Sequence, residues 1–147
     1  WDDKENRLGR RLVRFHRVQE GRYLKVSCSA ITQAEYAGNG DPVISCIRRG
    51  DGMDGCCVTS VDIIYLLERL VDESFQVEEK NRIRRNLEGL RPKTISKHKP
   101  GSEDFFQRIM DFPAPKPRNI EKDVKVFDWD LLPQALHKII SKYVGSF

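Results

Sequence analysis

The sequence predicts an α+β domain in which a small antiparallel sheet precedes a helix-turn-helix or winged-helix-like helical pair. Short apolar runs separated by turn residues fill residues 11–58, whereas residues 59–90 carry apolar side chains at helical spacing. A chain of 147 residues that is 39% hydrophobic is long enough to bury one core. We therefore expect a single domain over residues 11–147, preceded by a flexible N-terminal arm of mostly charged residues, 1–10.

The N-terminal half reads as four strands. Residues 11–19 and 23–32 are strand-like and flank Glu20-Gly21, which predicts a hairpin. A dense turn cluster then leads into the third strand, over residues 43–47. A second turn-rich loop separates this from a short strand, residues 56–58, which runs directly into the first long helix.

The helical pair begins at Thr59, because Asp62 follows three residues later, as in a capping box. A wide apolar stripe predicts that most of this first helix, residues 59–71, is buried. Turn residues follow, and a second helix spans residues 77–90. Its inward face consists of Ile83, Leu87 and Leu90.

The remainder of the chain predicts an extended basic segment, two more helices and one strand. Pro92 prevents the second helix from continuing. Ser102 is the expected cap of a helix over residues 103–112. The stretch from Pro113 to Arg118 is a stiff, basic linker of polyproline character. A strand over residues 124–127 then leads to the last helix, capped by Asp128 or Asp130, with a buried side of Leu131, Leu132, Leu136, Ile139, Ile140 and Tyr143.

Positive charge is concentrated around the second helix and the segment after it. Residues 80–99 hold eight Lys or Arg against one acid, a local net of +7, whereas the whole chain is only +4. The rest of the chain is therefore net −3, the difference between these two values. A buried helix followed by an exposed basic one is typical of modules that place a reading helix in the DNA major groove.

The second helix supplies the candidate base-reading residues Asn81, Arg82 and Arg85, because Asn and Arg pair with adenine and guanine edges. Charged side chains on its flank and beyond would hold phosphates and fix the register. These are Lys80, Arg84, Arg91, Lys93, Lys97 and Lys99. A solvated helix face, with Glu78 paired to Arg82 and Glu88 to Arg84, is the alternative interpretation.

Other classes of function find little support. The four cysteines lack a C-x-x-C spacing, so they predict neither a zinc site nor a disulfide framework. No nucleophile, phosphate-loop or metalloprotease motif occurs, so we expect no enzyme, no cofactor and no small-molecule substrate. No apolar run reaches the roughly 20 residues that a membrane span needs. Because the chain begins at Trp1, we expect it to be a fragment of a longer protein.

Four longer strings resemble the domain of the Medusa family of fungal developmental regulators. They are GRRLVRF, CVTSVDIIYLLERLV, VEEKNRIRRNLEGLRP and KPRNIEKDVKVFDW. The resemblance runs from about Trp1 to Tyr143. It implies a nuclear protein that governs transcription during spore formation, morphogenesis and adhesion, and it implies no particular site residues.

A weaker resemblance connects the order of elements to the fungal APSES and KilA-N DNA-binding domains. Val58-Thr59-Ser60 stands where those domains have V-N-A-T, and the helix over residues 103–112 has no counterpart in them. Taken together, the sequence predicts sequence-specific binding of double-stranded DNA within a transcription regulator, with other transcription factors as further partners. The alternative is a protein-interaction module whose basic strip meets an acidic partner.

Overall fold

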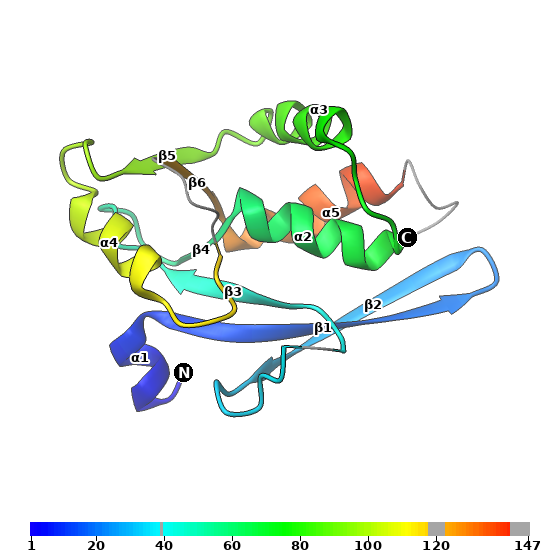
Figure 1. Cartoon of the computed structure of the whole chain (residues 1–147), viewed down its shortest axis with the longest axis horizontal. Helices are drawn as coiled ribbons and strands as arrows, with labels where there is room; N and C mark the ends of the chain where they lie inside the picture. The colour runs from blue at the N-terminus through cyan, green and yellow to red at the C-terminus, as the bar shows by residue number, and fades with distance from the viewer. Residues whose placement is uncertain (39, 118–122, 142–147) are drawn as a thin grey trace.

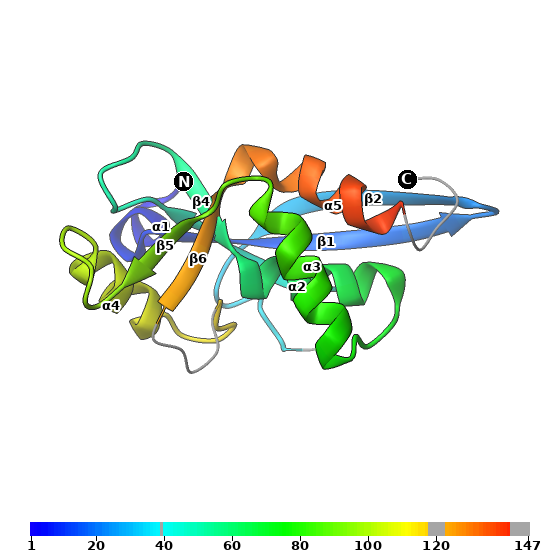
Figure 2. The ribbon, with the colours of Figure 1, turned by 90° about the horizontal axis from the view of Figure 1, so that it is seen from above.

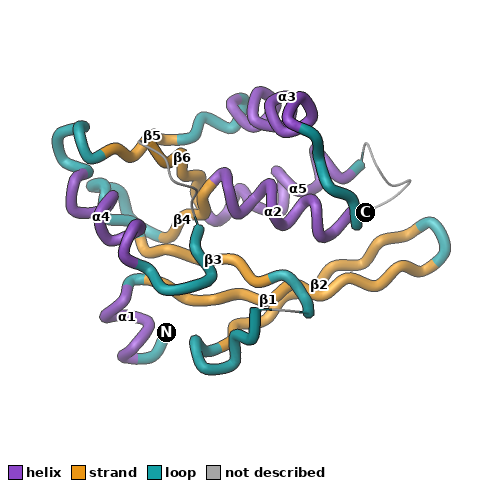
Figure 3. Tube along the Cα trace, in the orientation of Figure 1, coloured by secondary structure: helices purple, strands orange, loops and turns teal. Residues whose placement is uncertain are grey.

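The computed structural model describes residues 1–38, 40–117 and 123–141, which form five α-helices, one 3₁₀ turn and one six-stranded antiparallel sheet. The predicted α+β class is confirmed. Figure 3 separates the helices from the strands. In chain order the elements are α1 (Asp3–Leu8), β1 (Arg10–Glu20), β2 (Tyr23–Ile31), β3 (Val43–Arg48), β4 (Cys56–Thr59), α2 (Ser60–Val71), α3 (Val77–Glu88), β5 (Lys93–Ser96), α4 (Glu103–Asp111), β6 (Asp123–Asp128), η1 (Trp129–Leu131) and α5 (Leu132–Ile140).

The sheet has the strand order β2-β1-β3-β4-β6-β5. The predicted hairpin is confirmed, with Glu20 opposite Tyr23 and β1 paired to β2 along its length. The sheet is larger than expected, because two strands from the second half of the chain extend it. β6 pairs with β4, and β5 forms an outer edge beside β6. Residues 93–96, expected to be part of an extended tail, are therefore a sheet strand.

Alternating side chains divide the core between the two faces of this sheet. One face, which includes Ile44 and Val58, packs against α2 and α5. The other face, which includes Ile47 and Cys57, packs against α4. α3 lies outside α2 and α5 and forms an outer layer on that side of the molecule (Figures 1 and 2). The order of layers is thus α4, sheet, α2 with α5, and α3.

Residues 1–10 differ from the expected flexible arm, since residues 3–8 form helix α1. Asp2 and Glu5 make a reciprocal capping box at its start. Arg11 of β1 binds the Glu5 carboxylate at 2.8 Å. The ring of Trp1 lies 4.4 Å from the Arg48 guanidinium. A short charged segment is therefore fixed to the sheet by contacts that are distant in sequence.

The ends of the helices confirm some predicted caps and correct others. The Thr59 hydroxyl accepts a hydrogen bond from the Asp62 N–H, as predicted. The Asp62 carboxylate, however, accepts from the Ser45 N–H of β3 instead of completing the capping box. Ser102 does not cap α4 with its side chain, because its hydroxyl donates to the Ser96 and Lys99 carbonyls. Asp128 caps η1, immediately before α5. Tyr143 lies outside the described residues.

Candidate nucleic-acid interface

α3 packs against the rest of the molecule through its inner face. Ile83 and Leu87 are the buried residues of this helix, and both belong to the core shared with α2 and α5. The Lys138 ammonium of α5 donates to the Asn86 carbonyl at 3.2 Å, which fixes the helix from below. α4 covers the opposite face of the sheet, away from α3 (Figures 1 and 2). The outer face of α3 is consequently open to solvent.

The three predicted base-reading residues all lie exposed on this outer face. The Asn81 side-chain oxygen accepts a hydrogen bond from Arg84 at 2.9 Å, so the Asn81 amide keeps its N–H donors. Arg82 forms an ion pair with Glu79. Within the residues that the structure describes, no hydrogen bond or ion pair holds Arg85. It is therefore the base-reading candidate most ready to engage a partner.

The ion pairs within α3 that the solvated-face interpretation predicts do not form, and other ion pairs take their place. Arg82 binds Glu79 rather than Glu78, and Glu88 binds Lys125 of β6 rather than Arg84. Among the described residues, Glu79 is thus the one acid paired with a base-reading arginine of α3. The helix keeps most of its positive charge at its surface.

The predicted phosphate-binding residues fall into three groups. Lys80 and Arg84 stand on the flank of α3, with Lys80 4.0 Å from Glu68. Arg91 is exposed in the connection to β5. Lys97 and Lys99 are exposed in the turn after β5, where the Lys99 ammonium donates to the Thr94 carbonyl at 3.3 Å. These residues extend the basic surface from α3 toward the β5 edge.

Lys93 is engaged within the protein. Its ammonium donates to the Asp51 carbonyl at 2.9 Å and lies 3.5 Å from the Asp51 carboxylate. Arg49 binds the same carboxylate with two nitrogens, at 3.1 and 2.7 Å. Burial alone would raise the pKa of Asp51, but the Arg49 hydrogen bond and the charges of Arg49 and Lys93 hold it below its ordinary value. No local pattern in the sequence indicates this pairing, which joins the β3–β4 loop to the first residue of β5, 42 residues further along the chain.

A groove of about 490 Å³ runs beside α3, between α2 and the segment 113–117. Lys80 and Arg84 line it together with Tyr65, whose side chain is partly exposed, and Lys116. Aromatic and cationic side chains thus share one concave surface. Sequence analysis missed the groove because the contributing residues come from four separated segments.

The segment 113–117, which the sequence predicts as a linker, is fixed against the sheet by three hydrogen bonds. Gln33 donates to the Ala114 carbonyl at 2.6 Å, and Arg10 to the Pro115 carbonyl at 2.7 Å. The Thr59 hydroxyl, while capping α2, donates to the Pro117 carbonyl. The described part of the linker is therefore a wall of the groove.

Two buried charged groups lie behind this wall. Arg10 is 2% exposed and donates to Ser45 and Gln33 as well as to Pro115. Burial lowers the pKa of Arg10 to about 10 and raises the pKa of Asp62 to about 7, although each group's charge partly offsets the effect on the other. The Asp62 carboxylate, by accepting from the Ser45 N–H, fixes the start of α2 to β3.

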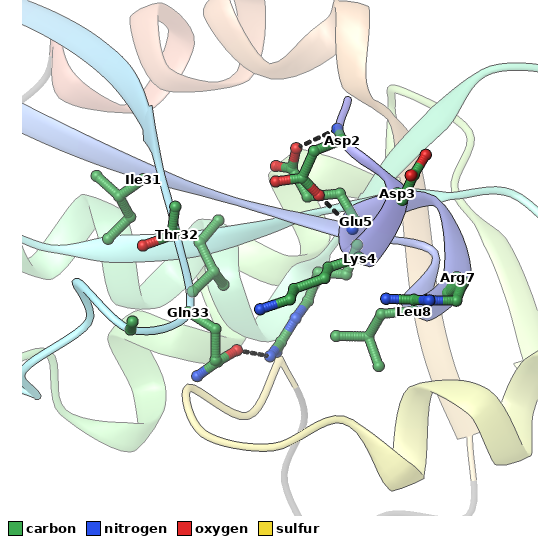
Figure 4. Close-up of a pocket in the computed structure, with 12 residues that line it drawn as sticks. Asp2, Asp3, Lys4, Glu5, Arg7, Leu8, Ile31, Thr32 and Gln33 are labelled. Carbon is green, nitrogen blue, oxygen red and sulfur yellow. Dashed lines mark hydrogen bonds between the residues drawn. The ribbon is translucent and has the colours of Figure 1, made fainter.

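A second cavity, of about 620 Å³, lies beside α1 on the side of the molecule away from α3. Figure 4 shows its lining, in which Gln33 accepts the bond from Arg10 and Asp2 and Glu5 cap one another. Its walls combine apolar side chains such as Ile31 with both acids and bases. No catalytic pair of nucleophile and base is evident among these described residues.

Metal and membrane chemistry find no support in the described parts of the chain. No group of three or more His, Cys, Asp or Glu residues there could hold a metal ion. None of the helices described is long and apolar enough to cross a membrane.

These features define an α+β domain that presents a basic helix on its outermost layer. A family model described as "Domain of unknown function (DUF7082)" matches residues 1–140, and the chain belongs to this family. Neither the curated proteins nor the solved structures include a match to this chain.

Proposed function

We propose that this domain binds double-stranded DNA in a sequence-specific manner as part of a transcription regulator. The observation that carries the proposal is the outer face of α3, where Asn81, Arg82, Arg84 and Arg85 are exposed together while Ile83 and Leu87 fix the helix below them. A helix of 12 residues is about 18 Å long, and the major groove, about 12 Å wide, admits such a helix. The resemblance to the Medusa family supports a nuclear role in fungal development.

The contacts divide into those that read bases and those that hold phosphates. Arg85 is the first candidate for a guanine edge, since no partner holds it within the described chain. Asn81 and Arg82 follow, once Arg82 exchanges Glu79 for the nucleic acid. The phosphate contacts come from Lys80, Arg84, Arg91, Lys97 and Lys99. Lys93 is omitted because its ammonium is already held by the carbonyl and carboxylate of Asp51.

The backbone of Arg91 adds a second argument. This residue has φ of +56°, in the left-handed region that favours glycine, although its side chain is exposed. A non-glycine residue in this region costs on the order of 1 kcal/mol. An arginine in a strained conformation, between α3 and β5 on the basic surface, suits a role for its charge in binding.

The proposal is tested by measuring the binding of the domain to a mixed-sequence DNA duplex. Fluorescence anisotropy reports this binding at a series of salt concentrations. Each neutralised phosphate contributes about −0.9 to the slope of log K against log salt, so five contacts give a slope of roughly −4 to −5. Arg22→Ala, in the hairpin turn distant from α3, is the control and should leave the slope unchanged. The absence of binding at low salt would refute a DNA interface.

The groove beside α3 supports a second candidate, an acidic peptide of another transcription factor. Tyr65 lies there among Lys80, Arg84 and Lys116, a combination that suits an acidic chain with an apolar residue. Tyr65→Ala separates the two functions, because it should weaken binding of an acidic peptide while leaving the salt slope on duplex DNA intact. Equal loss of both activities would place the DNA in the groove as well.

A further inference from the structure

β2 is a long, exposed edge of the sheet. It is the outermost strand on its side, and within the described chain no strand pairs with its outer side. The tip of the β1–β2 hairpin also projects beyond the helices (Figures 1 and 2). β2 has nine residues and no proline, and its pairing with β1 continues without a bulge from Tyr23 to Ile31. Such an edge is a template for another strand, whereas the opposite edge, β5, has only four residues.

The backbone groups that β2 offers at this edge belong to alternate residues. The Phe15 N–H of β1 donates to the Pro42 carbonyl at 2.9 Å, on the β3 side. Phe15 is opposite Cys28, so this pair exchanges no hydrogen bonds across the hairpin. Because bonded and non-bonded pairs alternate along the ladder, the even-numbered residues of β2 direct their N–H and C=O groups away from β1. These residues are Leu24, Val26, Cys28 and Ala30.

The same four residues form the apolar face of β2. Leu24 belongs to the core beneath α2 and α5, and Val26 packs against that core. The odd-numbered residues between them, Lys25, Ser27 and Ser29, are exposed. A strand that bonds to this edge must place its own outward-directed residues opposite these four, and directly opposed residues lie on one face of a sheet. The strand that completes the edge therefore has apolar residues at alternate positions, as β2 itself does.

The two ends of the edge carry opposite charges. Arg22, in the turn before β2, is exposed, and within the described chain no hydrogen bond or ion pair holds it. At the other end, the Glu35 carboxylate accepts from the Thr32 N–H at 2.9 Å. Thr32 continues the even-numbered alternation, so this bond holds the carboxylate at the outer edge. In an antiparallel pair of β2 strands, the acidic end of each edge meets the basic end of the other.

We propose that two copies of this domain associate by antiparallel pairing of β2 with β2 of the second copy, about a two-fold axis at Ser27. All nine residues overlap in this register, because Ser27 is the central residue of the strand. Val26 is then opposite Cys28 of the second copy, and Leu24 is opposite Ala30, which gives about eight hydrogen bonds between the copies. The interface is the same patch on both chains, as a two-fold axis requires.

Two features of the register fit association of like copies. Arg22 comes opposite Thr32 of the second copy, beside the Glu35 carboxylate that Thr32 binds. The charge of Lys25 is already paired with Glu20 of its own hairpin at 3.0 Å. The two copies of Lys25 are four residues apart along the paired strands, about 13 Å, so they repel each other little. The proposed dimer does not involve α3 and does not depend on DNA binding.

Sedimentation equilibrium of the domain in a reducing buffer, over a series of protein concentrations, tests the dimer. The mass should rise from that of one chain to that of two. Cys28→Pro removes an outward N–H but no bond to β1, so it should raise the dimer dissociation constant by at least about tenfold. Cys28→Ser keeps the N–H and should dimerise like the parent. A parent that is monomeric throughout, or an undiminished dimer in folded Cys28→Pro, would overturn the proposal.

A charge exchange tests the antiparallel arrangement and does not require the proline variant to fold. Glu35→Arg and Arg22→Glu should each weaken the dimer, because each places like charges together at both ends of the interface. The double variant restores opposite charges and should recover most of the parent's affinity. A double variant that dimerises no better than either single variant would contradict the antiparallel pairing.

Cross-linking of the folded protein by oxidised glutathione tests the register. In a Cys28→Ser background, Ser27→Cys should give a covalent dimer, because non-bonded residues opposite one another in antiparallel strands have Cα atoms about 4.5 Å apart. Ser29→Cys in the same background is the matched control. Its two copies are about 13 Å apart in this register, so it should remain monomeric on a non-reducing gel. Cross-linking through position 29 but not through position 27 would overturn the axis at Ser27.

Discussion

At the scale of single residues, a small set of buried polar side chains fixes the start of α2. Thr59 accepts from the Asp62 N–H and donates to the Pro117 carbonyl, so one hydroxyl joins the helix to the wall of the groove. The Asp62 carboxylate binds the Ser45 N–H of β3. Sequence alone predicts the Thr59 cap, because its signal is local. The partner of the Asp62 side chain is 17 residues distant and leaves no local pattern.

Asp62 should make stability depend on pH. Burial raises its pKa to about 7 in the folded protein, from an ordinary value of 3.8. Between these values the folded state binds more protons than the unfolded chain, so the free energy of unfolding falls as pH rises from about 4 to 7 and is level above. The fall amounts to at most about 4 kcal/mol. Urea unfolding across this range measures it.

Asp62→Asn is the matched variant, since the amide oxygen can still accept from Ser45 but cannot ionise. The difference in unfolding free energy between the parent and this variant isolates the contribution of Asp62 from every other titrating group. A difference that is constant from pH 4 to 7 would contradict a raised pKa.

Arg91 offers a prediction that separates stability from binding. Glycine tolerates the left-handed backbone found there, so Arg91→Gly should leave the free energy of unfolding unchanged or raise it by up to about 1 kcal/mol. Under the proposed function the same variant should bind DNA more weakly and reduce the salt slope by about 1. Thermal unfolding and anisotropy on one preparation test both. A destabilised variant would show that the arginine is structural.

At the scale of elements, the helices and strands that the sequence predicts differ from those it does not predict in the sequence separation of the contacts that define them. The β1–β2 hairpin, α2 and α3 follow from local periodicity, and each was predicted nearly in full. α1 and β5 were not, because a six-residue charged helix and a four-residue basic strand have no apolar period. Each is defined by distant contacts, such as Trp1 with Arg48 and Thr94 opposite Lys125.

The candidate site was predictable to the same extent. The exposure of Asn81, Arg82 and Arg85 follows from the helical spacing of Ile83 and Leu87. The engagement of Lys93 by Asp51 does not, since it depends on the path of the β3–β4 loop. Charge counts along a sequence overstate a basic surface wherever folding supplies a buried acid.

Variants in α3 and in the basic segment that follows it should separate base reading from phosphate binding. Arg85→Ala should relax sequence preference at one position, with a loss of about 1–3 kcal/mol of discrimination. Lys97→Ala, in the turn after β5, should instead weaken binding evenly across sequences. Selection from a randomised duplex pool, repeated with each variant, compares the two. Unchanged preference in Arg85→Ala would mean that α3 does not read bases.

At the scale of the whole molecule, deletion of residues 1–9 tests where the folded domain begins. The side chains of α1 are not buried, but the segment contributes the Glu5–Arg11 ion pair, the Trp1–Arg48 contact and a hydrogen bond from the Arg48 N–H to the Gly9 carbonyl. Deletion of residues 1–9 should therefore cost about 1–3 kcal/mol while leaving the fold intact. Circular dichroism and urea unfolding measure this effect. Complete unfolding on deletion would make the segment part of the core.

The attachment of α3 through its inner face has a consequence for divergence within the DUF7082 family. Only Ile83 and Leu87 are buried in this helix, so its remaining positions can change with little effect on folding. Under the proposed function, relatives can therefore retain one scaffold while acquiring different DNA targets. Among relatives, positions 83 and 87 should therefore remain apolar, whereas positions 81, 82 and 85 should vary. Relatives that recognise the same partner should have the same residues at positions 81, 82 and 85.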